Sequence, residues 1–211
     1  MKKIIVIGAG GFGREVEMLI DQINEFELQW DFLGFIDDGV PEGSIIGASR
    51  VLGSLSKLID FDDVSVVISV ANPKSKVDIL NRIPKKHHFA TLIHPNVLIG
   101  KRVKIGLGSI ICAGNIITTD IKIGDHVILN LGCTVGHDTE IGDLCSFMPS
   151  INISGEVVIE KGVYVGTGAK IINQLTIGSF TLVGAGAVVS KSLPPRCTAV
   201  GIPAKPIKFH E

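Results

Sequence analysis

A histidine followed directly by a carboxylate is the residue pair of this sequence best suited to proton transfer. His137 and Asp138 end the segment Asn130-Leu-Gly-Cys-Thr-Val-Gly-His137-Asp138. An imidazole can take a proton near neutral pH, and a neighbouring carboxylate can orient the ring and stabilise its protonated form. The pair therefore predicts a general base at this position. The alternative is a solvated histidine with no role in chemistry.

A glycine-rich segment near the N-terminus has residue types that could bind phosphate. Gly8-x-Gly10-x-x-Gly13 follows a short apolar run and precedes a segment whose apolar residues have helical spacing. Backbone N–H groups at the start of a helix attract anions, and this glycine spacing is that of dinucleotide-binding loops. A second apolar run ends in Asp37 and Asp38, which could bind the hydroxyl groups of a ribose or another sugar. The alternative is a tight strand-to-helix turn with no ligand.

Strands and helices alternate in the part of the chain that carries these glycines. We expect strands at 3–7, 32–36 and 64–70, helices at 14–27 and 74–82, and an extended segment at 89–93. This order predicts an α/β domain, residues 1–92, with a small Rossmann-like parallel sheet. A domain of this size is too short for both mononucleotide-binding halves of a dinucleotide fold, which argues against an NAD enzyme.

A six-residue repeat occupies the rest of the chain. Counting from Ile99 to Val189 in steps of six, every position is a large apolar residue, and glycine often follows it. Three such units can close one triangular coil of a parallel β-helix, with the recurrent apolar residue pointing inward. We expect the glycines after these residues to relieve backbone strain at the corners. The unbroken frame leaves no room for an inserted loop.

Composition limits the classes of partner. The 211 residues are 45% hydrophobic and 19% charged, with a net charge of −1, so the chain has a core but no electrostatic footprint for nucleic acid or an anionic membrane. No apolar run reaches the length of a membrane-spanning helix. Four cysteines without CxxC spacing predict reduced, packed thiols in a soluble, cytoplasmic protein.

The repeat resembles the left-handed β-helix of hexapeptide-repeat acyltransferases, as the segments 123–128 (IGDHVI) and 141–146 (IGDLCS) illustrate. The resemblance implies an all-β domain, residues 93–211, that binds acetyl-CoA. A small Gly-loop domain followed by such a β-helix is similar to the PglD/NeuD/PerB-like family of sugar acetyltransferases. In that family the first domain holds a nucleotide-linked amino sugar.

This family resemblance implies a reaction and an assembly. The reaction is acetyl-CoA-dependent N-acetylation of a nucleotide-linked amino sugar, a 4-amino-4,6-dideoxyhexose, in the biosynthesis of lipopolysaccharide or another surface glycan. The assembly is a homotrimer. Two alternatives stay open: O-acetylation of a sugar of the sialic-acid type, and a noncatalytic ligand-binding trimer.

The resemblance also assigns site residues. It makes His137 the general base, with Asp138 as its orienting partner. The residues expected around the nucleotide sugar are Gly10, Gly11, Phe12, Gly13, Asp37, Asp38, Ala71 and Asn72. Those expected to contact acetyl-CoA are Asn130, Gly155, Gly168, Gly184 and Lys205. The three glycines of the second set could instead serve corner geometry alone.

The remaining histidines bear on a metal-dependent alternative. A site like that of γ-carbonic anhydrases needs three converging imidazoles, but only His126 and His137 lie inside the repeat and their spacing does not match its period. We therefore expect no metal. His126 could join the pocket or be exposed, and His94 could make hydrogen bonds between the domains. The histidines expected at the surface are His87, His88 and His210.

Overall fold

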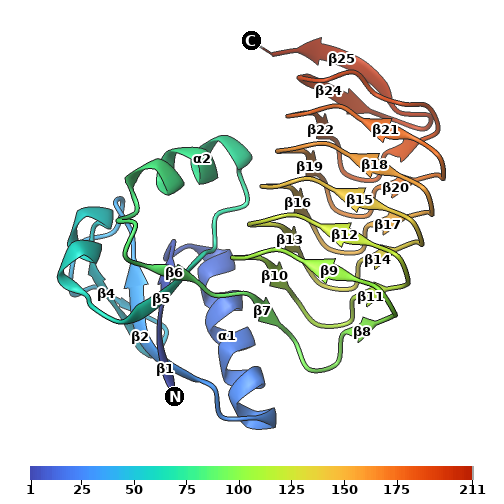
Figure 1. Ribbon diagram of the computed structural model, residues 1–211. Helices are drawn as coiled ribbons and strands as arrows, with labels where there is room; N and C mark the ends of the chain where they lie inside the picture. Colours follow the sequence, from blue (N-terminus) through green and yellow to red (C-terminus); the bar gives the residue numbers. More distant parts are fainter. Residues whose placement is uncertain (211) are drawn as a thin grey trace. The chain divides into compact units, whose positions relative to one another are not determined.

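The computed structural model describes residues 1–210 and divides the chain into two compact units. The first is Met1–Pro95 and the second begins at Asn96, three residues beyond the expected boundary. Figure 1 shows an α/β unit and a stack of triangular coils. Neither helix of the described chain is both long and apolar enough to span a bilayer.

The first unit is built on one mostly parallel sheet. Its strands are β1 (Lys2–Ile7), β2 (Trp30–Ile36), β3 (Ile45–Ile46), β4 (Ser49–Gly53), β5 (Val64–Ile68) and β6 (His88–Phe89). The spatial order is β3-β4-β2-β1-β5-β6, with β3 antiparallel to β4 and the other pairs parallel. The chain thus leaves β1 toward β2 on one side and later returns to β5 on its other side. A crevice for a ligand opens at the carboxyl ends of the strands where the strand order reverses in this way.

Two α-helices and a 3-10 helix, η1 (Leu55–Asp60), complete this unit. In α1 (Gly11–Phe26) the buried apolar residues have the expected helical spacing, and in α2 (Pro73–Arg82) Asn72 caps the N-terminus by accepting a hydrogen bond from Ser75 N. The expected β-α-β order is confirmed. The hairpin β3-β4 and η1 were not expected, because β4 has only two apolar residues and so no readable alternation.

The second unit is a parallel β-helix of two-residue strands, ended by the longer strands β24 and β25, which pair antiparallel. One face holds β10 (Ile110–Ile111), β13 (Ile128–Leu129), β16 (Ser146–Phe147), β19 (Tyr164–Val165), β22 (Leu182–Val183), β24 (Cys197–Val200) and β25 (Lys205–Phe209). The next holds β8 (Leu98–Ile99), β11 (Ile116–Ile117), β14 (Thr134–Val135), β17 (Asn152–Ile153), β20 (Lys170–Ile171) and β23 (Val188–Val189). The third holds β9 (Lys104–Ile105), β12 (Lys122–Ile123), β15 (Glu140–Ile141), β18 (Val158–Ile159) and β21 (Thr176–Ile177). Before them, β7 (Leu92–Ile93) ends the first unit.

The hexapeptide frame determines which side chains enter the prism. Strands pair with strands 18 residues away, as Thr134 does with Ile116, so three hexapeptides make one coil. The recurrent apolar residues are buried from Ile111 to Val189, as expected. Ile99 is 43% exposed and Ile105 only half-buried, because both lie in the first coil, where β8 and β9 are edge strands.

The residues with a positive φ at the corners are not the ones that the sequence predicted. Every sixth residue from Arg102 to Gly186 has a positive φ, between 55° and 75°, and most of these residues are not glycine. The glycines directly after the core positions answer another constraint. A Cβ on Gly136 would lie 2.5 Å from Gly155 N in the next coil. The expectation of strain relief at those glycines was wrong; they permit close approach of neighbouring coils.

Buried thiols contribute to the core of the prism. Cys112, Cys133, Cys145 and Cys197 are all buried. Burial raises the pKa of the Cys133 thiol to about 11, because the surrounding apolar groups disfavour the thiolate. At neutral pH this thiol is therefore protonated and unreactive, which fits the packing role expected from the sequence.

Candidate active site

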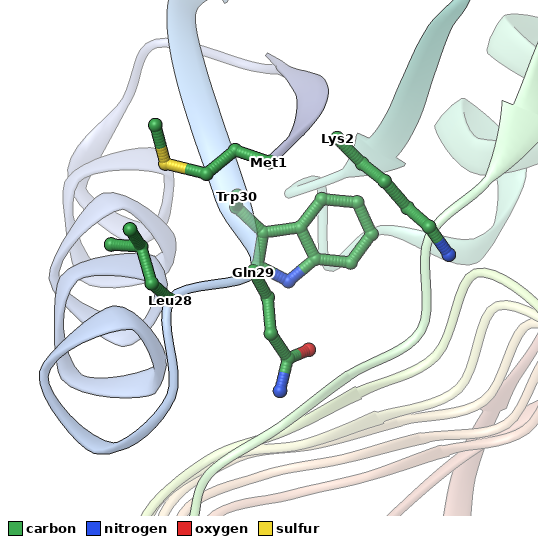
Figure 2. A pocket seen from close by; sticks show the side chains of 5 residues that line it. All are labelled: Met1, Lys2, Leu28, Gln29 and Trp30. Carbon is green, nitrogen blue, oxygen red and sulfur yellow. The ribbon is translucent and has the colours of Figure 1, made fainter.

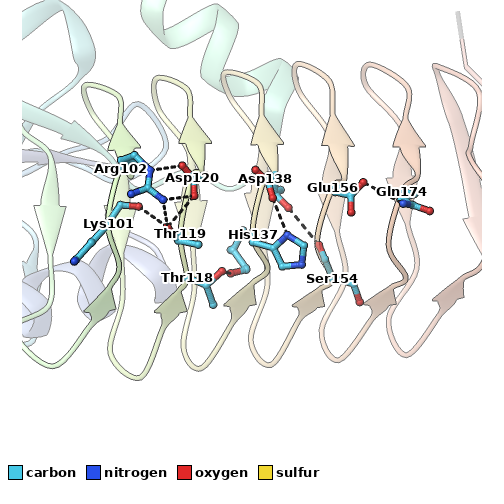
Figure 3. Close-up of polar contacts among 12 residues, drawn as sticks. Lys101, Arg102, Thr118, Thr119, Asp120, His137, Asp138, Ser154, Glu156 and Gln174 are labelled. Atoms are coloured by element: carbon cyan, nitrogen blue, oxygen red, sulfur yellow. Dashed lines mark hydrogen bonds and ion pairs between the residues drawn. The ribbon is translucent and has the colours of Figure 1, made fainter.

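His137 and Asp138 form a hydrogen-bonded pair on an open corner of the prism, between β14 and β15. His137 Nδ1 lies 2.8 Å from Asp138 Oδ2, and the two side chains are 56% and 60% exposed. Figure 3 shows the imidazole standing on this corner with the carboxylate beside it. With Nδ1 donating to the carboxylate, Nε2 is the ring atom left to accept a proton from a bound molecule.

The backbone of this pair is held by the coils on both sides. Asp138 has φ 56°, and its N–H donates to Thr119 O at 3.2 Å. Glu156 N, in the following coil, donates to His137 O at 2.8 Å. An exposed ion pair adds little to stability, so the rigidity of the site comes from these rungs of the β-helix. The backbone of this corner therefore holds the imidazole at a fixed position.

Gly155 lies one coil beyond His137 and leaves room for its ring. A Cβ at this position would stand 2.6 Å from His137 Cε1 and Nε2, closer than nonbonded carbon atoms approach. The sequence expectation was a close approach of the pantetheine arm. In the structure the group that fills the space above Gly155 is the imidazole itself.

On the other side of His137, an ion pair occupies the same corner. Arg102 Nη2 donates to Asp120 Oδ2 at 2.7 Å, and Arg102 Nε donates to the other carboxylate oxygen. Thr119 Oγ1 also donates to Asp120 Oδ2, at 3.0 Å. The hydrogen bond from Arg102 and then that from Thr119 lower the pKa of Asp120 to about 2, so this carboxylate is ionised at neutral pH.

Three of the other residues expected to contact acetyl-CoA, Asn130, Gly168 and Gly184, lie in different coils on one corner of the prism, which is not the corner of His137. Asn130 is buried on a different corner, between β13 and β14, where its Oδ1 accepts from Leu131 N at 2.7 Å. Gly168 has φ 72° and open space around it, whereas a Cβ on Gly184 would meet Val200. Lys205 is exposed at the start of β25. Within one chain, these residues do not gather around His137.

The first unit has a cavity of about 200 Å³ at the carboxyl ends of its central strands. Its lining residues are Ile7, Gly8, Ile36, Asp37, Asp38, Gly39, Leu55, Val70, Ser75 and Ile79. The cavity includes the expected pair Asp37 and Asp38. Ala71 and Asn72 are not among the lining residues, and the Asn72 side chain is occupied in capping α2. The cavity lies where the strand order favours a ligand.

The two carboxylates of the cavity are held by backbone donors. Asp37 accepts from Ala9 N at 2.8 Å and from Gly39 N at 2.7 Å, so it ties the glycine loop to the end of β2. Asp38 accepts from Leu55 N at 2.7 Å and pairs with Arg82 at 2.7 Å. The Leu55 hydrogen bond and the Arg82 side chain lower the pKa of Asp38. Their oxygens retain further lone pairs for a hydroxyl or N–H donor.

The glycine loop combines two constrained and two open positions. Gly8 has φ 111°, and a Cβ on Gly13 would lie 2.1 Å from Gly8 O, so the turn from β1 into α1 needs both glycines. A Cβ on Gly10 or Gly11 would meet nothing within 4 Å. Gly10 is the N-cap of α1 and, without a side chain, leaves the first N–H groups of the helix to other partners. Phe12 is half-buried.

Several residues that line the cavity were not predicted from the sequence. Val70 follows β5, and Ser75 and Ile79 lie in α2; their only signal was their closeness to the expected pair Ala71-Asn72. Leu55 comes from η1, which had no readable pattern. Arg82, the cation that pairs with Asp38, ends α2, and only the three-dimensional packing of α2 beside the sheet brings it there.

The other histidines are not all where the sequence predicted them. His87 was expected at the surface, but it is 6% exposed, because its ring lies between two backbone carbonyls, with Nε2 3.0 Å from Leu58 O and Nδ1 3.4 Å from Val64 O. His88 is exposed, and His210 Nε2 lies 2.7 Å from Thr198 Oγ1. His126 is buried on a corner different from that of His137. Within residues 1–210, no three His, Cys, Asp or Glu side chains are arranged to hold a metal ion.

A second hollow lies at the opposite ends of β1 and β2. It has a volume of about 470 Å³, and Figure 2 shows it lined by Met1, Lys2, Leu28, Gln29 and Trp30. None of these side chains is a carboxylate, imidazole or thiol. The hollow therefore lacks the side-chain types that the His137–Asp138 corner offers for proton transfer.

Comparisons with known proteins find a family model for part of the first unit and relatives for almost the whole chain. Residues 3–83 match the family model of the PglD N-terminal domain. GDP-perosamine N-acetyltransferase of Escherichia coli O157:H7 is 34% identical over 96% of this chain and 95% of its own length. WeeI of Acinetobacter baumannii AYE superposes with a TM-score of 0.89, at 36% identity, over 97% of this chain and 99% of that one.

A structure with bound ligands is also similar along its whole length. PerB of Caulobacter crescentus, in complex with CoA and GDP-perosamine, has a TM-score of 0.82 and 27% identity, over 98% of this chain and 97% of that one. The β-helix of this chain is accordingly left-handed, as in these relatives. The E. coli relative is 34% identical along almost the whole of both chains. The chain therefore belongs to the PglD/NeuD/PerB-like family of hexapeptide-repeat sugar acetyltransferases and is an acetyltransferase.

Proposed function

We propose that this protein transfers the acetyl group of acetyl-CoA to the amine of a nucleotide-linked 4-amino-4,6-dideoxyhexose, in the biosynthesis of a bacterial surface glycan. The observation that carries the proposal is the match, over almost the whole of both chains, to an enzyme that N-acetylates GDP-perosamine. Both halves of such a reaction have a counterpart here: a cavity at a switch point of an α/β sheet, and an exposed histidine on a β-helix.

The cavity of the first unit is assigned to the sugar nucleotide. Its volume of about 200 Å³ is below the ~300–1,000 Å³ of sites that enclose a whole small molecule, so it takes one part of the substrate. The open N-terminus of α1, beside Gly10 and Gly11, suits the diphosphate. Asp37 and Asp38 offer acceptors to the hydroxyl or N–H groups of the nucleoside or sugar.

The chemistry is assigned to His137. The substrate's amine nitrogen attacks the thioester carbonyl carbon, its C–N bond forms and the C–S bond breaks. His137 Nε2 takes the proton that the nitrogen loses and passes it to the departing thiolate, so that the products are the amide and the thiol. Asp138, bonded to Nδ1, keeps Nε2 facing the acceptor and stabilises the imidazolium. No metal takes part in this scheme.

The acetyl-CoA is assigned to the side of the prism, with Lys205 facing its phosphates. His137 on an exposed corner forms only one wall of a cleft, and Asn130 lies on another corner of the same chain. A homotrimer, in which a corner of one prism faces the next, would supply the second wall. The donor site is therefore proposed to lie between subunits.

A substrate screen tests this function. The intact protein is incubated with acetyl-CoA and a panel of GDP-, UDP- and dTDP-linked amino sugars, with sialic acid and free serine as further acceptors. Thiol release reports turnover, and mass spectrometry locates the new acetyl group. Amide formation on a nucleotide sugar supports the proposal. Ester formation on a sugar hydroxyl, or acetyl-CoA binding without turnover on any acceptor, would replace it with an O-acetyltransferase or a binding protein.

A further inference from the structure

The corner that carries His137 is also a column of charges. Because strands pair at intervals of 18 residues, residues 102, 120, 138, 156 and 174 stack in successive coils. Figure 3 shows these side chains in a row: Arg102, Asp120, Asp138, Glu156 and Gln174. The imidazole of His137 lies in the middle coil of this row. The fold therefore places charged side chains in a fixed order around the imidazole.

The order of the charges makes an oriented pair beside the imidazole. Asp120 is one coil from His137, whereas its partner Arg102 is two coils away. The guanidinium holds both carboxylate oxygens, so the pair has a fixed orientation with its negative end toward the histidine. The Asp120 carboxylate is closer to His137 than the Arg102 guanidinium is. It therefore stabilises a protonated imidazole more than the guanidinium destabilises it.

The other charged groups near this corner are already partnered or more distant. Asp138 is bonded to the imidazole itself, and Glu156, one coil beyond His137, accepts from the neutral Gln174 Nε2 at 3.0 Å and keeps its own charge. On the flanking face, Lys122 and Glu140 neutralise each other at 2.6 Å. Lys101 lies two coils from His137, and Lys170 donates to Ser150 O and Asn152 Oδ1. The Arg102–Asp120 pair is therefore the ion pair on this corner in which a carboxylate one coil from His137 is opposed by a cation two coils away.

We propose that Asp120 is a positioning residue that stabilises the protonated form of His137 during acetyl transfer, and that Arg102 limits this effect by partly neutralising Asp120. The inference rests on the proposed role of His137 as general base. The permanent ionisation of Asp120 supports it, because a carboxylate with a pKa of about 2 keeps its charge while the imidazole gains and loses a proton. The Arg102–Asp120 pair thus adjusts the pH range in which the base works.

Variants that remove one charge at a time test this arrangement. In Asp120→Asn, the midpoint of the acidic limb of kcat/KM and the titration midpoint of the His137 ring should both fall by about half a pH unit, as expected for charges one coil apart near solvent. In Arg102→Gln both midpoints should rise, because Asp120 is then no longer neutralised. Arg102→Lys keeps the cation and should stay close to the unchanged protein.

The measurement is an NMR titration of histidines labelled in the ring of the full-length protein, with the His137 signal assigned by its loss in His137→Gln. Asp62→Asn is the matched control, because it removes a carboxylate from an exposed ion pair with Lys86 in the first unit. Its midpoints should not move. The shifts should shrink in about 1 M salt, where screening reduces interactions between exposed charges.

Opposite shifts in the Asp120 and Arg102 variants support the proposal, because a loss of structure at the corner would move both midpoints in the same direction or neither. Midpoints that do not move, or that move the same way, overturn it. The ring titration does not require turnover. If His137→Ala remained fully active, the proposed base would be wrong while the titration still reported whether Asp120 and Arg102 act on the imidazole.

Discussion

At the scale of single residues, His137 combines exposure with a fixed orientation. More than half of its side chain is open to solvent, yet its Nδ1 is bonded to Asp138, its carbonyl accepts from Glu156 N, and the N–H of Asp138 donates to Thr119 O. A base that must meet two substrates has to be accessible, and a base that must transfer a proton has to be aimed. The corner of a β-helix meets both needs, because its backbone is rigid while its side chains point outward.

Removing the imidazole should lower turnover far more than it lowers binding. His137→Ala is expected to reduce kcat by roughly 10²- to 10⁴-fold, with little change in KM for acetyl-CoA, because general-base catalysis typically contributes that much. Asp138→Asn should cost less, since it only orients the ring. Steady-state kinetics of both variants check this. An unchanged kcat in His137→Ala would assign the proton to another group or to an amine that binds already deprotonated.

Gly155 should matter through His137. In Gly155→Ala the new Cβ would displace the imidazole, and a misplacement on that scale costs roughly 10²-fold in rate. In the double variant with His137→Ala, the second change should have no further effect on kcat, as expected for residues that act through one contact. A further loss in the double variant, with a raised KM for acetyl-CoA, would show that Gly155 faces the pantetheine arm instead.

At the scale of elements, the glycine loop should separate binding from folding. Gly11 has open space, so Gly11→Val should leave α1 intact and raise KM for the sugar nucleotide much more than for acetyl-CoA. Gly13→Val is the contrasting change, because its Cβ would collide with Gly8 O and lower the melting temperature. If Gly11→Val weakened only acetyl-CoA, the assignment of ligands to the two units would be inverted.

The far end of the prism should show the opposite pattern. Lys205 is exposed on β25, so Lys205→Glu leaves packing unchanged and places a negative charge where the phosphates of CoA are proposed to lie. KM for acetyl-CoA should rise and that for the sugar nucleotide should not. Salt should weaken the difference, because the charge is solvent-exposed. Equal KM values in the variant and the parent would remove Lys205 from the donor site.

The strands and helices with the strongest periodicity were the ones that sequence could predict. The repeat from Ile99 to Val189 identifies the β-helix because its side chains alternate between interior and exterior in a constant frame. The positive φ at Asp138 and its equivalents could not be predicted, since nine non-glycine residues at these corners adopt it under the constraint of neighbouring coils. The lining residues Leu55 and Ile79 were equally invisible, because the packing of separate elements brings them to one cavity.

At the scale of the whole molecule, the separation of candidate residues over two corners predicts an assembly. Asn130 and His137 lie on different corners of one prism, so the donor site that we propose needs a second prism beside the first. Light scattering at micromolar concentration should give a mass near three times 22.4 kDa. A monomer at that concentration would contradict both the trimer and the shared site, while leaving the sugar-nucleotide cavity of the first unit untouched.

The continuous frame of the coils also limits how such a molecule can change. Inserting one residue would turn interior side chains outward in every later strand of that coil, whereas inserting 18 residues would leave each side chain on its own face. One added coil between His137 and Lys205 would lengthen their separation by a single strand spacing, ~4.8 Å. The prism is in this sense a ruler with coarse divisions. The distance between His137 and Lys205, and with it the length of acyl donor that would fit between them, can therefore change only by whole coils.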